Sequence, residues 1–400
     1  LKQRQWFFVS SLRLRSAMSL TSKDKIPLSL LKQLPKAELH THLDGCIRTK
    51  TLMDIAQKHG KVQFPGLAPG EIPSEQELQD ILLPPGGAAS LAEFLRAYEY
   101  SLPVLQTPEA MQRVFRETAE DYMADGVTYV EIRFCPALHT SSGHNSEKIL
   151  RAVIEESKKV SEESNNGAAL PITRVIVCAL RNAPVSESIE MAELAVKIAK
   201  EEESLPEEDR QLVGFDLAGD EAAFATSLFT EAFDYVHKNS SLGITVHSGE
   251  AAGWESVEQA IDLARATRLG HGVRLAESPQ LVKRLELNVD HPTTIEVCVT
   301  SNLLTKTINC LEEHPVRQFY DAGPGLRIVP CTDGIAMIGT TVSEQYDILQ
   351  CSFGFTPQEL VSILEDSFKA AFCPPTVKES LLKAATSKYQ TLLSSHGFVQ

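Results

Sequence analysis

The sequence predicts an α/β protein folded as a (β/α)8 barrel of the TIM type, with an insertion after the first strand and extra C-terminal helices. Eight short apolar runs occur along the 400 residues, and helical patterns lie between them. Most of the runs are continuous rather than alternating, as in strands that are covered on both faces. The predicted strands are 37–42, 127–133, 174–180, 212–217, 243–247, 267–270, 294–298 and 326–331.

The helices between these runs are predicted from apolar side chains at helical spacing, with charged side chains on the other face. The segment 255–265 also begins with acidic residues and ends in Arg265, which suits the helix dipole. The last two predicted helices close the chain after the eighth strand. The predicted helices cover 108–125, 187–203, 222–238, 255–265, 357–371 and 376–393.

A long segment separates the first two strands and is predicted to be an insertion over the barrel mouth. It contains a predicted helix at 49–59 and a Pro/Gly-rich stretch at 62–88. Within that stretch, 74–83 places three apolar residues on one side of a short helix. This helix is either a lid over the mouth or a helix docked on the barrel.

The first residues differ in composition from the rest. The chain begins with Leu1, and residues 1–20 carry basic but no acidic side chains. We expect 1–25 to be a disordered or non-native extension, with an organelle-targeting segment as the alternative. Residues 26–395 are expected to form a single barrel.

The net charge limits the classes of molecule that the protein can bind, and the cysteine pattern indicates the redox state of its thiols. The net charge is −15, with 38 basic and 53 acidic residues, which argues against binding nucleic acid or an anionic membrane. No apolar run reaches the roughly 18 residues that a membrane span needs. The eight cysteines form no CxxC pair and are expected to be reduced, mostly buried thiols. A small-molecule substrate and a cytoplasmic location are therefore expected; the oligomeric state stays open, and a monomer is compatible with the sequence.

In such barrels the chemistry occurs at the C-terminal ends of the strands. The first strand ends in His40-Thr41-His42. Residues i and i+2 of a strand face the same way, so two imidazoles would point together as metal ligands. Two hydrogen-bonded or solvated histidines would give the same local pattern.

Other strand ends add to this pair. The fifth strand ends in His247, the sixth in His271, and Asp333 follows the eighth. Three imidazoles and one carboxylate suit zinc, with iron or cobalt as substitutes. Zinc lowers the pKa of a bound water to about 7 and so equips a site for hydrolysis. Glu250, three residues after His247, is a candidate proton donor if burial raises its pKa, or else a surface carboxylate.

The fourth strand runs into Asp216-Leu217-Ala218-Gly219-Asp220-Glu221. Gly219 would let the backbone approach a ligand closely. A tight strand-to-helix turn is the alternative explanation.

These residues together resemble the adenosine deaminase family over about 34–393. HxH alone is shared by many metal-dependent amidohydrolases, but the set of motifs in this order is specific. The family's metal-binding (β/α)8 barrel agrees with the strand count. The motifs are PKAELHTHLDG (35–45), DLAGDE (216–221), HSGE (247–250), GHG (270–272), TSN (300–302) and TD (332–333).

The resemblance implies a ligand set and catalytic groups. One Zn2+ per chain would be held by His40, His42, His247 and Asp333. Glu250 would protonate purine N1 while hydroxide attacks C6. His271 would orient the hydroxide, and Asp333 could assist as a base. Gly219 would donate to purine N3 from its backbone, and Asp44 would contact the ribose 5′-hydroxyl.

The implied function is the hydrolytic deamination of adenosine, and of 2′-deoxyadenosine, to inosine and ammonia in purine salvage. Asp44 would repel a 5′-phosphate and so favours a nucleoside over a nucleotide. Gly334 departs from the family, which usually has a second aspartate that contacts purine N7 there; Val299 stands where many members have Pro. The alternatives are therefore a deaminase of another 6-aminopurine, such as N6-methyl-AMP or adenine, and a catalytically silent binding protein.

Overall fold

The computed structural model describes residues 25–59, 62–68, 70–83 and 90–398. The predicted N-terminal extension lies outside these residues, apart from Lys25, and so does part of the Pro/Gly-rich stretch.

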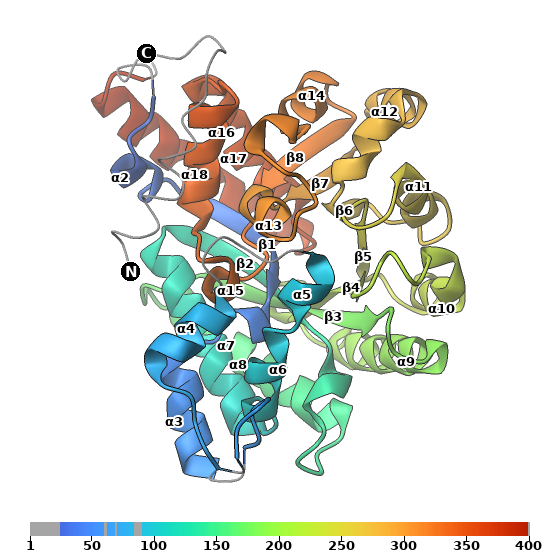
Figure 1. Cartoon of the computed structure of the whole chain (residues 1–400). Helices are drawn as coiled ribbons and strands as arrows, with labels where there is room; N and C mark the ends of the chain where they lie inside the picture. Colours follow the sequence, from blue (N-terminus) through green and yellow to red (C-terminus); the bar gives the residue numbers. More distant parts are fainter. Residues whose placement is uncertain (1–24, 60–61, 69, 84–89, 399–400) are drawn as a thin grey trace.

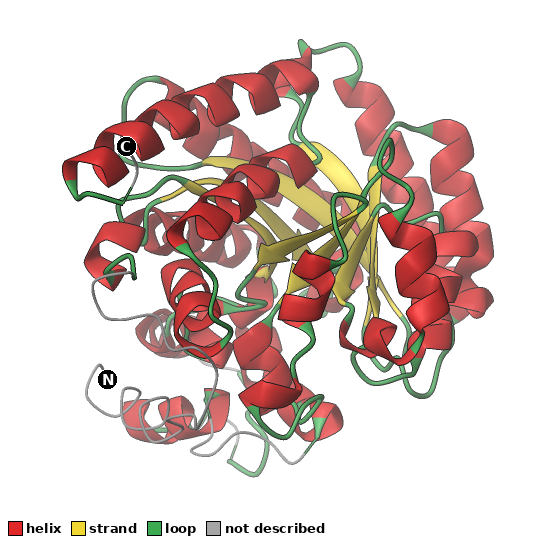
Figure 2. Cartoon of the chain, turned by 90° about the horizontal axis from the view of Figure 1, so that it is seen from above, coloured by secondary structure: helices red, strands yellow, loops and turns green. Residues whose placement is uncertain are grey.

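Eight parallel strands form one sheet in the order β1 to β8, which confirms the predicted (β/α)8 barrel (Figure 2). Closure between the first and last strands comes from the backbone of the segment after β8. Asp333 N donates to His40 O at 2.9 Å, and His42 N donates to Asp333 O at 2.8 Å. The strands are β1 (Lys36–His42), β2 (Val127–Phe134), β3 (Ile172–Leu180), β4 (Leu212–Ala218), β5 (Gly243–Ser248), β6 (Arg268–His271), β7 (Thr293–Val297) and β8 (Leu326–Pro330).

The strand residues are almost all buried, as the continuous apolar runs predict, because helices surround the barrel (Figure 1). Helix α17 packs on β8 and β1, and α18 packs on α17, which confirms the extra C-terminal helices. The helices after β2 are α8 (Ser146–Asn165), α9 (Val185–Glu202), α10 (Thr230–Asn239), α11 (Trp254–Asp262), α12 (Pro279–Glu286), α13 (Val299–Leu304), α14 (Val316–Asp321), α15 (Ile335–Ile338), α16 (Val342–Ser352), α17 (Pro357–Ala370) and α18 (Pro375–Ser395).

The insertion after β1 is helical and reaches the barrel mouth. Ser74 and Glu77 form a capping box at the start of α4, and Leu78 and Leu82 of this helix are buried. Helix α4 packs against α3, which also belongs to the insertion, so both predictions for 74–83, a lid and a docked helix, stay open. Helix α6 contacts the short turn Leu43–Gly45 that follows β1. The helices of this N-terminal part are α2 (Leu28–Leu31), α3 (Thr49–His59), α4 (Glu75–Leu82), α5 (Leu91–Leu95), α6 (Tyr98–Ser101) and α7 (Pro108–Ala124).

The predicted helix 222–238 is wrong in its first half, since α10 begins only at Thr230. The buried Arg181 accounts for the difference. Its guanidinium donates to Phe224 O at 2.7 Å and to Thr226 Oγ1 at 3.0 Å. These hydrogen bonds hold the Phe224 carbonyl and the Thr226 hydroxyl against Arg181, in positions that a continuous helix over 222–238 would not give them.

All eight cysteines are unpaired and six of them are buried, in agreement with the expected thiols. Among the described residues, no helix is long and apolar enough to cross a membrane.

Candidate active site

The C-terminal ends of four strands bring the predicted site residues to one edge of the barrel. His40 and His42 end β1, His247 is near the end of β5, and His271 is the last residue of β6. His271 and Asp333 have left-handed φ values of 64° and 68°. This conformation is unfavourable for residues other than glycine and often marks functional sites.

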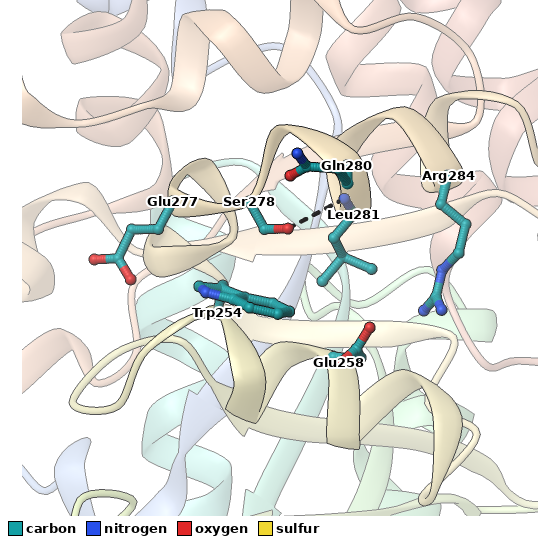
Figure 3. Close-up of a pocket in the computed structure, with 7 residues that line it drawn as sticks. All are labelled: Trp254, Glu258, Glu277, Ser278, Gln280, Leu281 and Arg284. Carbon is teal, nitrogen blue, oxygen red and sulfur yellow. Dashed lines mark hydrogen bonds between the residues drawn. The ribbon is translucent and has the colours of Figure 1, made fainter.

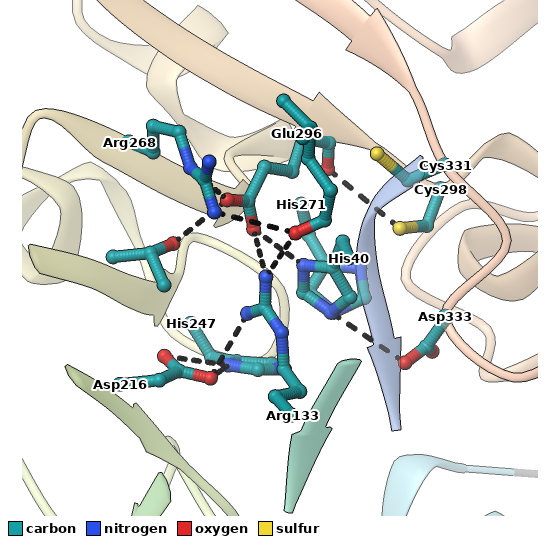
Figure 4. Close-up of polar contacts among 12 residues, drawn as sticks. His40, Arg133, Asp216, His247, Arg268, His271, Glu296, Cys298, Cys331 and Asp333 are labelled. Atoms are coloured by element: carbon teal, nitrogen blue, oxygen red, sulfur yellow. Dashed lines mark hydrogen bonds and ion pairs between the residues drawn. The ribbon is translucent and has the colours of Figure 1, made fainter. Parts of the chain in front are cut away.

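These side chains converge on one point. One ligand atom each from His40, His247, His271 and Asp333 lies within 4.8 Å of all the others (Figure 4). His42 Nε2 lies 3.0 Å from His247 Nε2 and 3.5 Å from Asp333 Oδ1. The structure therefore brings the four predicted ligands and His271 together, and geometry alone admits His271 as a further ligand.

The surroundings favour a cation at this point. Burial lowers the pKa of His42, His247 and His271, which favours the neutral form of these imidazoles. Burial acts to raise the pKa of Asp333, but the imidazoles around it hold that pKa well below its usual range.

Two carboxylates deeper in the barrel orient the imidazoles. Glu296 Oε2 lies 2.6 Å from His40 Nδ1, and Asp216 Oδ2 lies 3.1 Å from His247 Nδ1. Arg133 donates to both carboxylates. A carboxylate on Nδ1 leaves Nε2 free for a ligand, as in many metal sites.

Glu250 lies in the same mouth, 3.5 Å from His271 Nε2 through its Oε2 atom. Burial, followed by the charges of Asp333 and Glu221, raises the pKa of Glu250 well above its usual range. The Glu221 carboxylate fixes the loop that carries Glu250. It accepts hydrogen bonds from four successive backbone N–H groups, those of residues 249–252.

Asp44 is 5% exposed, and its Oδ1 has no hydrogen-bond partner among the described residues. Burial raises the pKa of this carboxyl to about 7. A buried polar atom without a partner is costly, and a ligand hydroxyl at Oδ1 would supply one.

Two glycines at the mouth have packing explanations. Gly219 has φ 98°, and a Cβ there would lie 2.5 Å from Asn182 Oδ1, so the turn itself requires glycine. A Cβ at Gly334 would lie 3.1 Å from Gly45 O. The position where the family usually has aspartate is thus packed here against backbone.

Sequence reasoning assigned no role to several supporting residues. Arg133 and Glu296 were visible as charged residues inside apolar strand runs, a signal of buried pairing. Three other supporting residues lie within the family motifs: Asp216, Glu221 and Ser301. The Ser301 Oγ donates to Asp333 Oδ2 at 2.7 Å.

A concavity of about 420 Å³ lies between α11 and α12 (Figure 3). Its lining includes Trp254, Glu258 and Arg284 but no histidine or cysteine. None of the residues that line this concavity belongs to the His/Asp cluster at the barrel mouth.

Comparison with known proteins agrees with this geometry. Residues 35–388 match the family model described as adenosine deaminase. The chain is 35% identical over 358 residues to an adenosine deaminase from Mycobacterium marinum, covering 87% of this chain and 93% of the relative. It is 34% identical over 380 residues to a probable adenosine deaminase from Dictyostelium discoideum, covering 95% of this chain but only 46% of that longer protein.

Solved structures share the fold. A Burkholderia ambifaria amidohydrolase with bound zinc superposes with a TM-score of 0.80 at 21% identity, covering 96% of this chain and 97% of the other. An N6-mAMP deaminase from Arabidopsis superposes with a TM-score of 0.74 at 25% identity, covering 90% and 99%. On the family model and the relatives of similar length, the chain belongs to the adenosine deaminase family.

Proposed function

We propose that the protein hydrolyses adenosine, and 2′-deoxyadenosine, to inosine and ammonia, with one zinc ion per chain. Family membership supports a hydrolytic purine deaminase. The observation that carries the proposal is the meeting of a five-residue cluster, His40, His42, His247, His271 and Asp333, with the buried Glu250.

The donor set fits a zinc ion. His40 Nε2 is buried without a hydrogen-bond partner among the described residues, and Asp333 Oδ1 lies 3.5 Å away. Burial and Arg133 act to lower the pKa of His40, but the Asp333 and Glu296 carboxylates outweigh them and raise it. The surroundings of His40 Nε2 thus favour a positive charge. The ion would be held by His40, His42, His247 and Asp333. When bound, zinc lowers the pKa of water and supplies hydroxide at neutral pH.

Glu250 supplies the proton that the reaction needs. Addition of hydroxide to C6 breaks the aromaticity of the purine, so the ring nitrogen N1 must gain a proton in the same step. Because burial raises the pKa of Glu250 well above its usual range, the protonated carboxyl is favoured and can donate this proton. Glu221 holds the loop that aims it.

His271 and Asp333 are proposed to act on the attacking oxygen. His271 orients it through Nε2, and Asp333 accepts its proton and delivers that proton to the C6 amino group. Departure of ammonia from the tetrahedral carbon then gives inosine.

Asp44 favours a nucleoside. Its Oδ1, which has no hydrogen-bond partner in the described part of the chain, suits a 5′-hydroxyl, whereas an ionised carboxylate would repel a phosphate. Gly219 is proposed to donate its backbone N–H to purine N3.

A second candidate is the same reaction on N6-methyl-AMP or adenine. It is favoured by Gly334, which offers no side chain to purine N7, and by the likeness to the Arabidopsis N6-mAMP deaminase. The loss of one hydrogen bond to a charged group costs about 1.5–3 kcal/mol, which is too little to exclude adenosine.

A substrate panel tests the proposal. Zinc-loaded protein is incubated with adenosine, 2′-deoxyadenosine, N6-methyl-AMP and adenine, and ammonia release and products are measured. We expect the highest kcat/KM with adenosine. Intact adenosine beside turnover of N6-methyl-AMP or adenine would establish the second candidate instead.

A further inference from the structure

His271 is the residue whose role the cluster geometry leaves open. Its Nε2 faces the predicted metal ligands and lies 3.5 Å from Glu250 Oε2. A neutral imidazole carries its proton on one nitrogen and a lone pair on the other. Whether His271 binds metal or donates a hydrogen bond therefore depends on which nitrogen is protonated.

The tautomer of His271 can be traced from a backbone N–H group that lies outside the cluster. Val316 N, at the start of α14, donates to His314 Nδ1 at 3.1 Å. A backbone N–H can only donate, so His314 Nδ1 must carry a lone pair. His314 is buried, and burial lowers its pKa to about 3, so the ring is neutral. Its single proton is therefore on Nε2.

Asn302 connects His314 to His271 by a hydrogen bond on each side of its amide group. His314 Nε2 lies 3.2 Å from Asn302 Oδ1, which accepts its proton. The amide Nδ2 then faces His271 Nδ1 at 3.0 Å. The reversed amide would set two N–H groups against each other at His314 and is disfavoured, since Asn302 is fully buried.

We propose that this relay, formed by the Val316 N–H, His314 and Asn302, fixes neutral His271 with its proton on Nε2. That nitrogen then has no lone pair for a metal, so His271 is a hydrogen-bond donor beside the ion rather than a ligand. His314 and Asn302 are positioning residues. The tautomer follows from the hydrogen bonds alone; its use to orient the attacking oxygen rests on the proposed deaminase function.

The test is the tautomer itself, read by long-range 1H–15N NMR of zinc-loaded protein labelled with 15N-histidine. Comparison with His271→Gln assigns the signals. We expect a protonated-type shift for Nε2 and an unprotonated-type shift for Nδ1 of His271. The opposite pattern in the wild-type protein would overturn the proposal, whether or not the protein deaminates adenosine.

Asn302→Asp replaces the amide donor by a carboxylate of the same shape that can only accept. We expect the His271 proton to move to Nδ1 and kcat to fall about 100-fold or more, as for loss of one donor to a developing oxyanion, with KM changed less than about threefold. An unchanged His271 spectrum in a folded variant would contradict the relay. Correct tautomers with no deamination of any substrate would reject the proposed function and leave the relay standing.

Two variants of His314 test the relay at a second residue, so that the result does not depend on Asn302→Asp alone. His314→Phe removes the donor to Asn302 and should give a mixture of His271 tautomers, whereas His314→Gln keeps a donor and should restore the Nε2–H form. Gln345→Glu is the matched charge control. Its side chain contacts Thr300 rather than His271, so the His271 shifts should stay as in the wild type.

Discussion

The Arg133 guanidinium donates to Glu296, with 2.9 Å between Nη2 and Oε2, and both side chains are fully buried. The same carboxylate contacts His40, while the other end of the guanidinium contacts Asp216 beside His247. One arginine therefore supports the carboxylates that orient two predicted metal ligands.

Arg133→Met should weaken both zinc binding and the fold. Loss of an outer-shell partner costs about 10–100-fold in metal affinity, and breaking a buried ion pair costs about 3–5 kcal/mol. Zinc competition with a chelator and denaturant unfolding measure the two effects. The matched control is Arg284→Met, an exposed partner of Asp262, for which we expect less than about 1 kcal/mol. Equal effects of the two substitutions would contradict the supporting role of Arg133.

Glu250→Gln should abolish most turnover and leave the zinc content unchanged. The amide cannot donate a proton as a carboxyl does, and general acid catalysis contributes about 10²–10⁴-fold. Steady-state kinetics and metal analysis of the same sample check both parts. Full activity in this variant would remove Glu250 from the mechanism. A wild-type protein that turns over no purine would favour a binding protein instead.

Glu221→Gln tests the loop that carries Glu250. The charged carboxylate accepts four backbone hydrogen bonds, and its neutral amide would form weaker and fewer ones. We expect kcat to fall about tenfold and the free energy of unfolding to fall by about 1.5–3 kcal/mol. The exposed Glu203→Gln serves as the control. Unaltered kcat in Glu221→Gln would show that this loop needs no such support.

The base of the barrel should show a pH-dependent stability. Burial lowers the pKa of Lys36 from 10.5 to about 8. Between these values the unfolded chain binds the proton and the folded chain does not, so the free energy of unfolding rises with pH. Relative to Lys36→Met, we expect the wild type to gain about 3 kcal/mol from pH 8 to 10.5. A difference that stays constant over this range in urea unfolding would disprove the shifted pKa.

Much of the barrel could be predicted because each strand is a local feature. A strand buried on both faces must be a continuous apolar run, as at 174–180, and its end is visible where polar residues such as His247 begin. The first half of the helix predicted at 222–238 failed for a non-local reason, namely the hydrogen bonds of Arg181 from the end of β3.

The candidate site and the hydrogen bonds that orient its side chains could be predicted only in part. His40 and His42 are visible as a pair because they are two residues apart. The contact of Arg133 with Glu296 joins residues 163 apart, and the sequence indicates only that two charges must be neutralised in the core. The His271 tautomer depends on a backbone N–H, which no side-chain pattern encodes.

Side chains from β1, β5 and the segment after β8 are proposed to hold one ion. This proposal is tested most directly by anomalous diffraction at the zinc edge from crystals of zinc-loaded protein. We predict one peak per chain, about 2.0–2.2 Å from His40, His42, His247 and Asp333, with His271 beyond ligand distance. A peak elsewhere in the molecule, or a cluster that binds no zinc, would show that these side chains do not form the metal site.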